Sequence, residues 1–175
     1  MTDIQAIRFL WRYMVYADAQ IIAAAETVSD EGYSREQNIS VGSLEKLLNH
    51  AMLAQRTWLQ RLNGLDVMYV DDPAPTRKEL PGRWAAVHQE LLAFADVQTP
   101  GSLQRVIRSR NRGGKRFELP TWTVMLHVAD HATYHRGQLN SMIKLAGGTP
   151  SPVMLYPYSV GQGFGKELPS EQRGE

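Results

Sequence analysis

Cysteine is absent from the 175 residues of this chain. The protein therefore has no disulfide, no cysteine-ligated zinc, no iron–sulfur cluster and no thiol nucleophile of its own. Any metal ion must be held by nitrogen and oxygen ligands, and the only imidazoles available are those of five histidines. A reaction at a thiol would need a cosubstrate that carries the sulfur.

Long apolar runs and an excess of charge of one sign are also missing. No apolar stretch approaches the roughly 20 residues that a membrane-spanning helix needs. Asp3 and Arg8 interrupt the first apolar stretch, which argues against a secretory leader. The 19 basic and 18 acidic side chains, with 43% hydrophobic residues, exclude a disordered chain and a globally basic nucleic-acid binder. We expect a cytoplasmic protein without a membrane partner, with one domain over residues 1–160 and a mobile tail over 161–175.

Apolar residues recur at spacings of three and four in four segments, which is typical of helices that bury one face. The predicted helices cover about residues 7–24, 43–62, 81–95 and 120–146. Asp30-Glu31-Gly32 is expected to end the first pattern, and a polar stretch follows to about Val41. Asn63-Gly64 and Gly147-Gly148 are stop signals for the second and fourth helices.

Two short runs, 105–109 and 115–119, flank the sequence Asn111-Arg112-Gly113-Gly114. A glycine pair between two such runs predicts a β-hairpin, which must lean on the helices because an isolated hairpin is marginally stable. After residue 148, prolines and glycines exclude another long helix. The predicted fold is all-α: a four-helix bundle with a short β-hairpin or extended insertion before the last helix.

His127, His131 and His135 are spaced four residues apart in the fourth predicted helix. Side chains at positions i and i+4 share a face with Cβ atoms about 5–6 Å apart, so two adjacent imidazoles can reach one ion. His127 and His135 are separated by roughly 12 Å and cannot. At 100° per residue, His135 lies about 30° from the centre of the apolar face, His131 about 70° and His127 about 110°. The pair that faces the bundle interior is therefore His131 and His135.

Two ligands make a poor metal site, so a third must come from another helix. His50 lies on the flank of the apolar stripe of the second predicted helix, a position that faces the gap toward a neighbouring helix. Three imidazoles without a fourth protein ligand leave positions open for water or substrate, as in catalytic sites. The alternative is that these histidines satisfy hydrogen bonds in the core. His88, beside Gln89 and Glu90, is expected to be solvated.

The segment 127–138, HVADHATYHRGQ, resembles the signature of the DinB family of damage-inducible metalloproteins, which ends in H-x-x-x-H-R-G-Q. Leu47-Leu48-Asn49-His50, followed by Trp58-Leu59, is similar to the second-helix histidine motif of that family. The resemblance covers about residues 5–150. Carried over residue by residue, it implies that His50, His131 and His135 are the metal ligands, which agrees with the helix phase.

The resemblance implies a four-helix bundle, often a homodimer, that holds a divalent ion such as zinc, nickel or manganese. Some relatives are S-transferases or isomerases that use a low-molecular-weight thiol as cosubstrate. The implied function is a metal-dependent enzyme acting on a small-molecule substrate, with a metal-bound thiol or water as nucleophile. The alternative is a non-enzymatic damage-response protein that binds nucleic acid or a protein partner, with a structural metal or none.

Metal-bound imidazoles usually donate their second N–H to a carboxylate, a carbonyl or water. The candidates around the three ligands are Asp18, Asp130, Gln138 and, at the edge of the site, His127. Solvation is the alternative for the carboxylates, and packing or helix-end hydrogen bonding is the alternative for Arg136 and Gln138. Tyr134 is expected to face a neighbouring helix or a dimer partner.

Residues 105–116 contain six basic side chains and no acid, which leaves about −5 for the rest of the chain. Among them, Arg108, Arg110 and Arg112 are candidate anion-binding residues for a carboxylate-bearing substrate or thiol cosubstrate. Two other interpretations stay open: a solvated hairpin whose cations prevent edge pairing, or contacts with nucleic-acid phosphates. Because Phe117 is the only aromatic residue there, base stacking is disfavoured and we do not expect a nucleic-acid partner.

Overall fold

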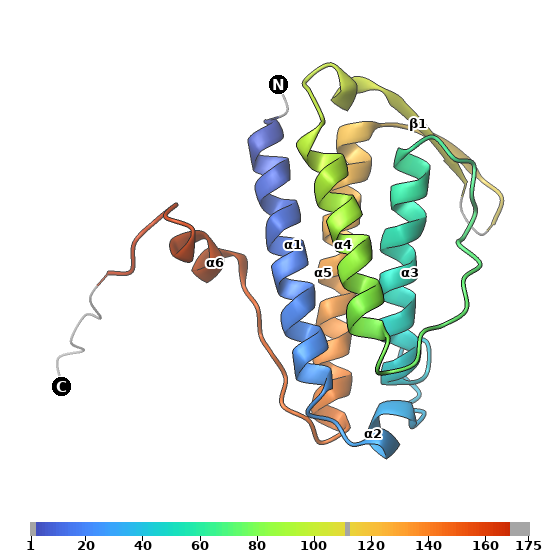
Figure 1. Ribbon diagram of the computed structural model, residues 1–175, viewed down its shortest axis with the longest axis vertical. Helices are drawn as coiled ribbons and strands as arrows, with labels where there is room; N and C mark the ends of the chain where they lie inside the picture. The colour runs from blue at the N-terminus through green and yellow to red at the C-terminus, as the bar shows by residue number, and fades with distance from the viewer. Residues whose placement is uncertain (1–2, 111–112, 169–175) are drawn as a thin grey trace.

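Four long helices form a bundle in the computed structural model, which describes residues 3–110 and 113–168 (Figure 1). They are α1 (Ile4–Ala25), α3 (Leu44–Leu62), α4 (Leu80–Asp96) and α5 (Thr121–Leu145). Helix α5 packs against α1 and α3, and α4 packs against the same two helices, so α4 and α5 lie on a diagonal of the bundle. The predicted all-α bundle is confirmed.

The connection between α3 and α4, residues 63–79, runs along the length of the bundle (Figure 1). As a result, α3 and α4 point in the same direction, and α1 and α5 point the opposite way. The Arg8 side chain, near the start of α1, donates to the carbonyl oxygens of Ala95 and Asp96 at the end of α4, which fits this antiparallel arrangement. We call residues 63–79 the crossover.

Local capping explains where the long helices begin and end. Asp3 caps α1 by accepting from the Gln5 backbone N–H at 2.8 Å, and Ser43 caps α3 by accepting from that of Lys46 at 3.2 Å. Gly64 after α3 and Gly147 after α5 have φ of 90° and 83°, a region where glycine carries no Cβ penalty. The predicted bounds of these helices are confirmed to within a few residues.

A short helix, α2 (Asp30–Ser34), stands where the sequence pattern predicts an end of helix and a polar stretch. That prediction is wrong, since α1 ends at Ala25 and Asp30 begins a new helix. Ser29 accepts from the Gly32 backbone N–H at 3.2 Å. The acidic side chains of the first turn stabilise α2, because their negative charge lies at the positive end of the helix dipole. Tyr33 is buried and anchors α2 beneath the bundle.

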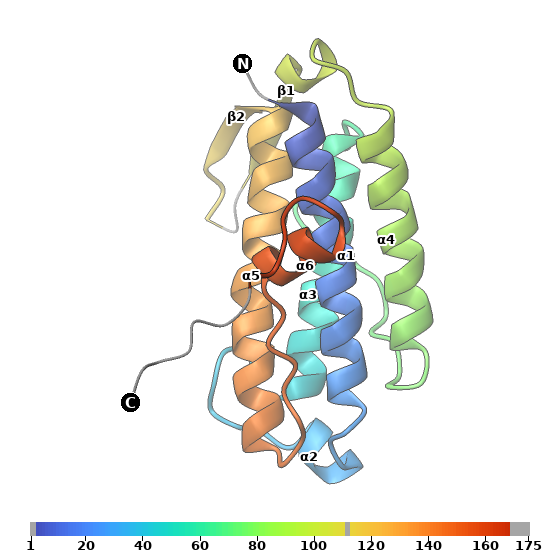
Figure 2. The ribbon, with the colours of Figure 1, turned by 90° about the vertical axis from the view of Figure 1, so that its left-hand side faces the viewer.

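The hairpin before α5 consists of β1 (Val106–Arg110) and β2 (Arg116–Pro120), which pair antiparallel. It follows a single 3₁₀ turn, η1 (Ser102–Gln104), and lies at the end of the bundle where α5 begins (Figure 2). Ile107 is 3% exposed, so the hairpin leans on the helices through an apolar contact. The predicted hairpin is confirmed with strands shifted by one residue.

A buried polar network joins the four long helices inside the apolar core. The Asp18 carboxylate on α1 accepts from Arg136 on α5 at 2.8 Å and from Gln55 on α3 at 2.6 Å, and it lies 3.2 Å from His88 Nε2 on α4. His88 is only 4% exposed, so the expectation that it is solvated is wrong. Its spacing of four from Trp84 places it on the buried stripe of α4, a signal that its polar neighbours in the sequence obscured.

The segment after α5 returns along α1 and contains the seven-residue helix α6 (Leu155–Gly161) (Figure 2). The Tyr158 ring lies 5.1–5.5 Å from the rings of Phe9, Tyr13 and Tyr16 on α1. Phe164, within the segment expected to be a tail, lies 4.9 Å from the Phe9 ring, and residues 169–175 are outside the described part. Within residues 3–110 and 113–168, no helix is long and apolar enough to cross a membrane.

Candidate metal centre

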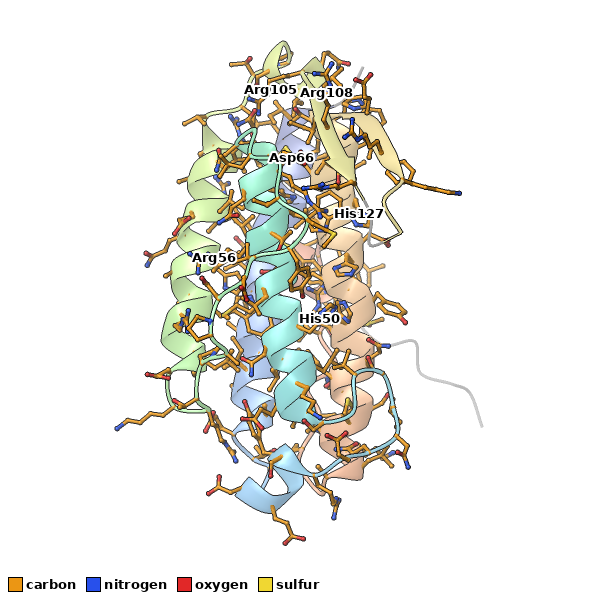
Figure 3. The ribbon with its side chains drawn as sticks, turned by 90° about the vertical axis from the view of Figure 1, so that its right-hand side faces the viewer. His50, Arg56, Asp66, Arg105, Arg108 and His127 are labelled. Atoms are coloured by element: carbon orange, nitrogen blue, oxygen red, sulfur yellow. The ribbon has the colours of Figure 1, made fainter. Side chains whose placement is uncertain are left out.

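Three imidazoles from two helices meet between α3 and α5. His50 extends from α3 toward α5 (Figure 3), and His131 and His135 extend from α5. One ring nitrogen of each lies within 4.8 Å of those of the other two. The Nε2 atoms of His131 and His135 are 3.1 Å apart, and the His50 and His135 rings meet edge to face at 4.8 Å between centroids. The structure therefore brings together the three histidines singled out as candidate ligands.

Burial favours the neutral form of two imidazoles of this cluster, those of His131 and His135. It lowers the pKa of His131 to about 4, and the neighbouring rings of His135, His127 and His50 act in the same direction. Burial also lowers the pKa of His135, against the opposing effect of its hydrogen bond to Gln138. A neutral imidazole is the form that can donate a lone pair to a metal, so the lowered pKa values favour His131 and His135 as ligands at pH 7.

Gln138 fixes the orientation of His135. Its amide oxygen lies 2.9 Å from His135 Nδ1, and its amide nitrogen donates to the Tyr134 hydroxyl at 3.0 Å. Because the amide oxygen can only accept, Nδ1 carries the proton and Nε2 keeps its lone pair. That lone pair is on the side where His131 Nε2 lies. The exposed Tyr134 therefore contacts the cluster indirectly, through the Gln138 amide that orients His135.

Tyr69, from the crossover, reaches His50. Its hydroxyl lies 2.8 Å from His50 Nδ1, and the two rings are nearly parallel, with 9° between their planes. This contact was not predicted from the sequence. Tyr69 lies in a segment without helical or strand periodicity, so its position depends on the path of the crossover and on no local pattern.

His127 and Asp130 lie at the edge of the cluster. The His127 ring stacks on His131 at 5.6 Å and meets the Trp58 ring at 4.7 Å, but His127 is not part of the three-histidine group. Partial burial lowers the pKa of His127, and the charge of Asp130 opposes this effect. Asp130 is exposed and influences His127 and His131 through its charge.

The remaining candidates take part in other interactions. Asp18 is bound within the polar network described above, where its cationic partner is Arg136. Arg108 pairs with Glu118 at 2.9 Å, and Arg110 lies 3.6 Å from Asp66, both at the hairpin end of the molecule. Arg112, the third arginine named for anion binding, is outside the described residues.

Comparisons with known proteins agree on one family. The model of the DinB family matches residues 3–167. Protein DinB of Bacillus subtilis is 22% identical over 153 residues, which are 82% of this chain and 88% of that protein. A DinB-like protein of Bacillus cereus superposes with a TM-score of 0.63 at 19% identity, over 82% of this chain and 93% of its own. A second one, from Bacillus subtilis, gives 0.64 at 16% identity, over 82% and 96%. At these identities, the two structures show a shared fold.

Proposed function

This chain belongs to the DinB family, and we propose that it is a divalent-metal-dependent enzyme whose ion is held by His50, His131 and His135. The observation that carries the proposal is the convergence of three ring nitrogens within 4.8 Å of one another between α3 and α5. An α-helical bundle commonly builds metal sites in this way, from side chains on facing helices.

The donor set fits a divalent transition metal. An ion about 2.0–2.1 Å from each imidazole nitrogen requires nitrogens roughly 3–4 Å apart. The 3.1 Å between His131 Nε2 and His135 Nε2 lies within that range, and a small side-chain rotation would bring the third nitrogen, now within 4.8 Å of both, into it. Because all three donors are imidazoles, zinc and nickel are favoured over manganese, which prefers oxygen ligands.

The residues of the chain orient the site and leave room for a reactant. Gln138 holds the His135 ring so that Nε2 faces the cluster, and the Tyr69 hydroxyl contacts Nδ1 of His50. With three protein ligands, coordination positions remain open for a substrate. A bound ion supplies the Lewis acidity that lowers the pKa of a thiol or a water molecule and turns it into a nucleophile. Because the chain has no cysteine, any such thiol belongs to a small cosubstrate.

Elemental analysis of protein purified without a histidine tag tests the ligand assignment. We expect one divalent ion per chain in the wild type and in His127→Ala, which removes the neighbouring imidazole outside the group. The double variant His131→Ala, His135→Ala should lose the ion. A stoichiometric ion that survives in the double variant would rule out this site.

Turnover assays then test the reaction class. The metal-loaded protein is incubated with an electrophile and each of several cellular thiols, and in parallel with an activated ester. Thiol consumption above background that requires both the metal and His131 supports the transferase. If no thiol accelerates the reaction while ester cleavage depends on the metal, the enzyme is a hydrolase.

A further inference from the structure

A cleft of about 450 Å³ lies between the hairpin and the end of α3, and Arg105, Arg108 and Asp66 mark it in Figure 3. Five arginines line it, against the two carboxylates of Asp66 and Glu118. They are Arg61, Arg105, Arg108, Arg110 and Arg116. The excess of cations, within a volume typical of small-molecule sites, indicates a ligand of negative charge. We call this cavity the arginine cleft.

Two of these arginines face each other across the hairpin. Arg110 on β1 is paired directly with Arg116 on β2 in the antiparallel register. Directly opposed side chains have Cβ atoms about 4.5–5.5 Å apart, and like charges in such a pair destabilise the hairpin. An anion between the two guanidinium groups offsets that repulsion, because each can donate two parallel hydrogen bonds to a carboxylate or phosphate.

Three of the five arginines are already engaged by the protein, and one of them, Arg108, pairs with Glu118 at 2.9 Å. Arg61 is 8% exposed and donates to the backbone carbonyls of Val67 and Met68, and Arg105 donates to that of Leu62. Arg110 differs. The Arg110 side chain is 41% exposed, but its Nε atom is buried. This Nε lies 3.6 Å from the Asp66 carboxylate, too far for a hydrogen bond, and has no acceptor among the residues that the structure describes. A buried donor left in this way is costly unless a ligand supplies the acceptor.

We infer that the arginine cleft binds the oxyanion group of a small molecule, a phosphate or a carboxylate, with Arg110 and Arg116 as its principal contacts. The concave shape and the two carboxylates that line it suit a compact anion better than a long polyanion. Arg61 also lies over the Trp58 ring at 4.5 Å, and Trp58 contacts His127 beside the histidine cluster. Arg61 follows His50 by eleven residues on α3, so at a rise of about 1.5 Å per residue the cleft begins about 16 Å along the helix from His50.

Anion titrations of the full-length protein at low ionic strength test this inference, with and without chelator. Isothermal titration and the rise in melting temperature are recorded with inorganic phosphate and with succinate. We expect saturable binding of at least one of them, and whichever binds more tightly identifies the oxyanion. Because the measurement on chelated protein needs no metal, its outcome is separate from that of the proposed enzymatic function.

Three variants locate the binding. Arg110→Gln should weaken it at least tenfold. Arg116→Glu should abolish it while raising the melting temperature of the ligand-free protein, because an opposed pair of unlike charges replaces a pair of like charges. Arg35→Gln removes the same charge from an exposed position just after α2 and should bind like the wild type.

Three results would overturn the inference. The first is the absence of phosphate and succinate binding to the wild type, and the second is binding that persists in Arg110→Gln and Arg116→Glu. The third is a duplex DNA that binds more tightly than either anion and loses affinity in the same two variants. In that case the arginines form a nucleic-acid surface, with a steep dependence of affinity on salt.

Discussion

Arg136 and Asp18, which are 118 residues apart in the chain, form an ion pair at 2.8 Å in which both side chains are buried. Arg136 directly follows His135, so the rotation of α5 that places Arg136 beside Asp18 also fixes the direction of His135. That rotation turns His131 and His135 toward α3 and His50. The ion pair in the core and the candidate metal centre are therefore two consequences of the same helix orientation.

Removing the Asp18 charge should destabilise the protein strongly. In Asp18→Asn the buried Arg136 loses its anionic partner, and we expect the free energy of unfolding to fall by about 3–5 kcal/mol. Urea denaturation measures the change. Asp96→Asn is the matched control, because its ion pair with Arg12 is about half exposed and should contribute less than about 1 kcal/mol. Equal losses in the two variants would contradict the role given to Asp18.

Removing the amide of Gln138 should weaken metal binding without unfolding the protein. Gln138→Ala leaves the His135 Nδ1–H without its acceptor, so the ring is no longer held with Nε2 toward the cluster. We expect the metal affinity to fall about 10- to 100-fold, measured by competition with a chromophoric chelator. Gln89→Ala, an exposed position on α4, is the control and should keep the wild-type affinity.

Tyr69→Phe removes the hydroxyl that contacts His50 while keeping the stacked ring. We expect the metal affinity to fall about 10-fold, at the lower end of the range for such outer contacts. The melting temperature of the metal-free protein should change little, because Tyr69 lies at the surface. An unchanged affinity would show that the hydroxyl does not orient His50.

The metal-free protein should lose stability as the pH falls from about 6.5 toward 4. An unfolded histidine titrates near 6.5, whereas burial lowers the pKa of His131 in the folded protein to about 4. Between these values the unfolded chain binds more protons, so acidification favours unfolding. The lowered pKa values of His127 and His135 act in the same direction. Denaturant titrations across this window should show a smaller loss in His131→Gln, and parallel curves would contradict this assignment.

Periodicity and stop signals predicted the long helices because those features are local. Ser29, Asp30 and Glu31 also form a local helix start, a cap followed by acidic residues, and α2 was missed because these residues were interpreted only as an end. His88 was misplaced for a similar reason. Its neighbours Gln89 and Glu90 are polar, but its phase relative to Trp84 and Leu91 is that of a buried residue.

Other parts of the site depend on how distant segments meet, which no local pattern specifies. The angular positions of His131 and His135 relative to the apolar face of α5 were sufficient to select them over His127 as candidate ligands. The position of His50 on the flank of the apolar stripe of α3 pointed to the third member of the cluster. The contact of Tyr69 with His50 depends on the path of the crossover. Likewise, the basic segment was visible in the sequence, but Arg61 and Asp66 join it only because α3 ends beside the hairpin.

The crossover, α4 and the hairpin all lie between His50 and the other two histidines of the cluster along the chain. An ion held by all three would tie together two points of the chain roughly 80 residues apart, as a reversible crosslink. Closing a loop of that length in the unfolded chain costs more entropy than closing a short one, so an ion placed there constrains the whole chain. Metal loading would then raise the resistance of the entire bundle to unfolding, since an ion that binds only the native state stabilises it by mass action.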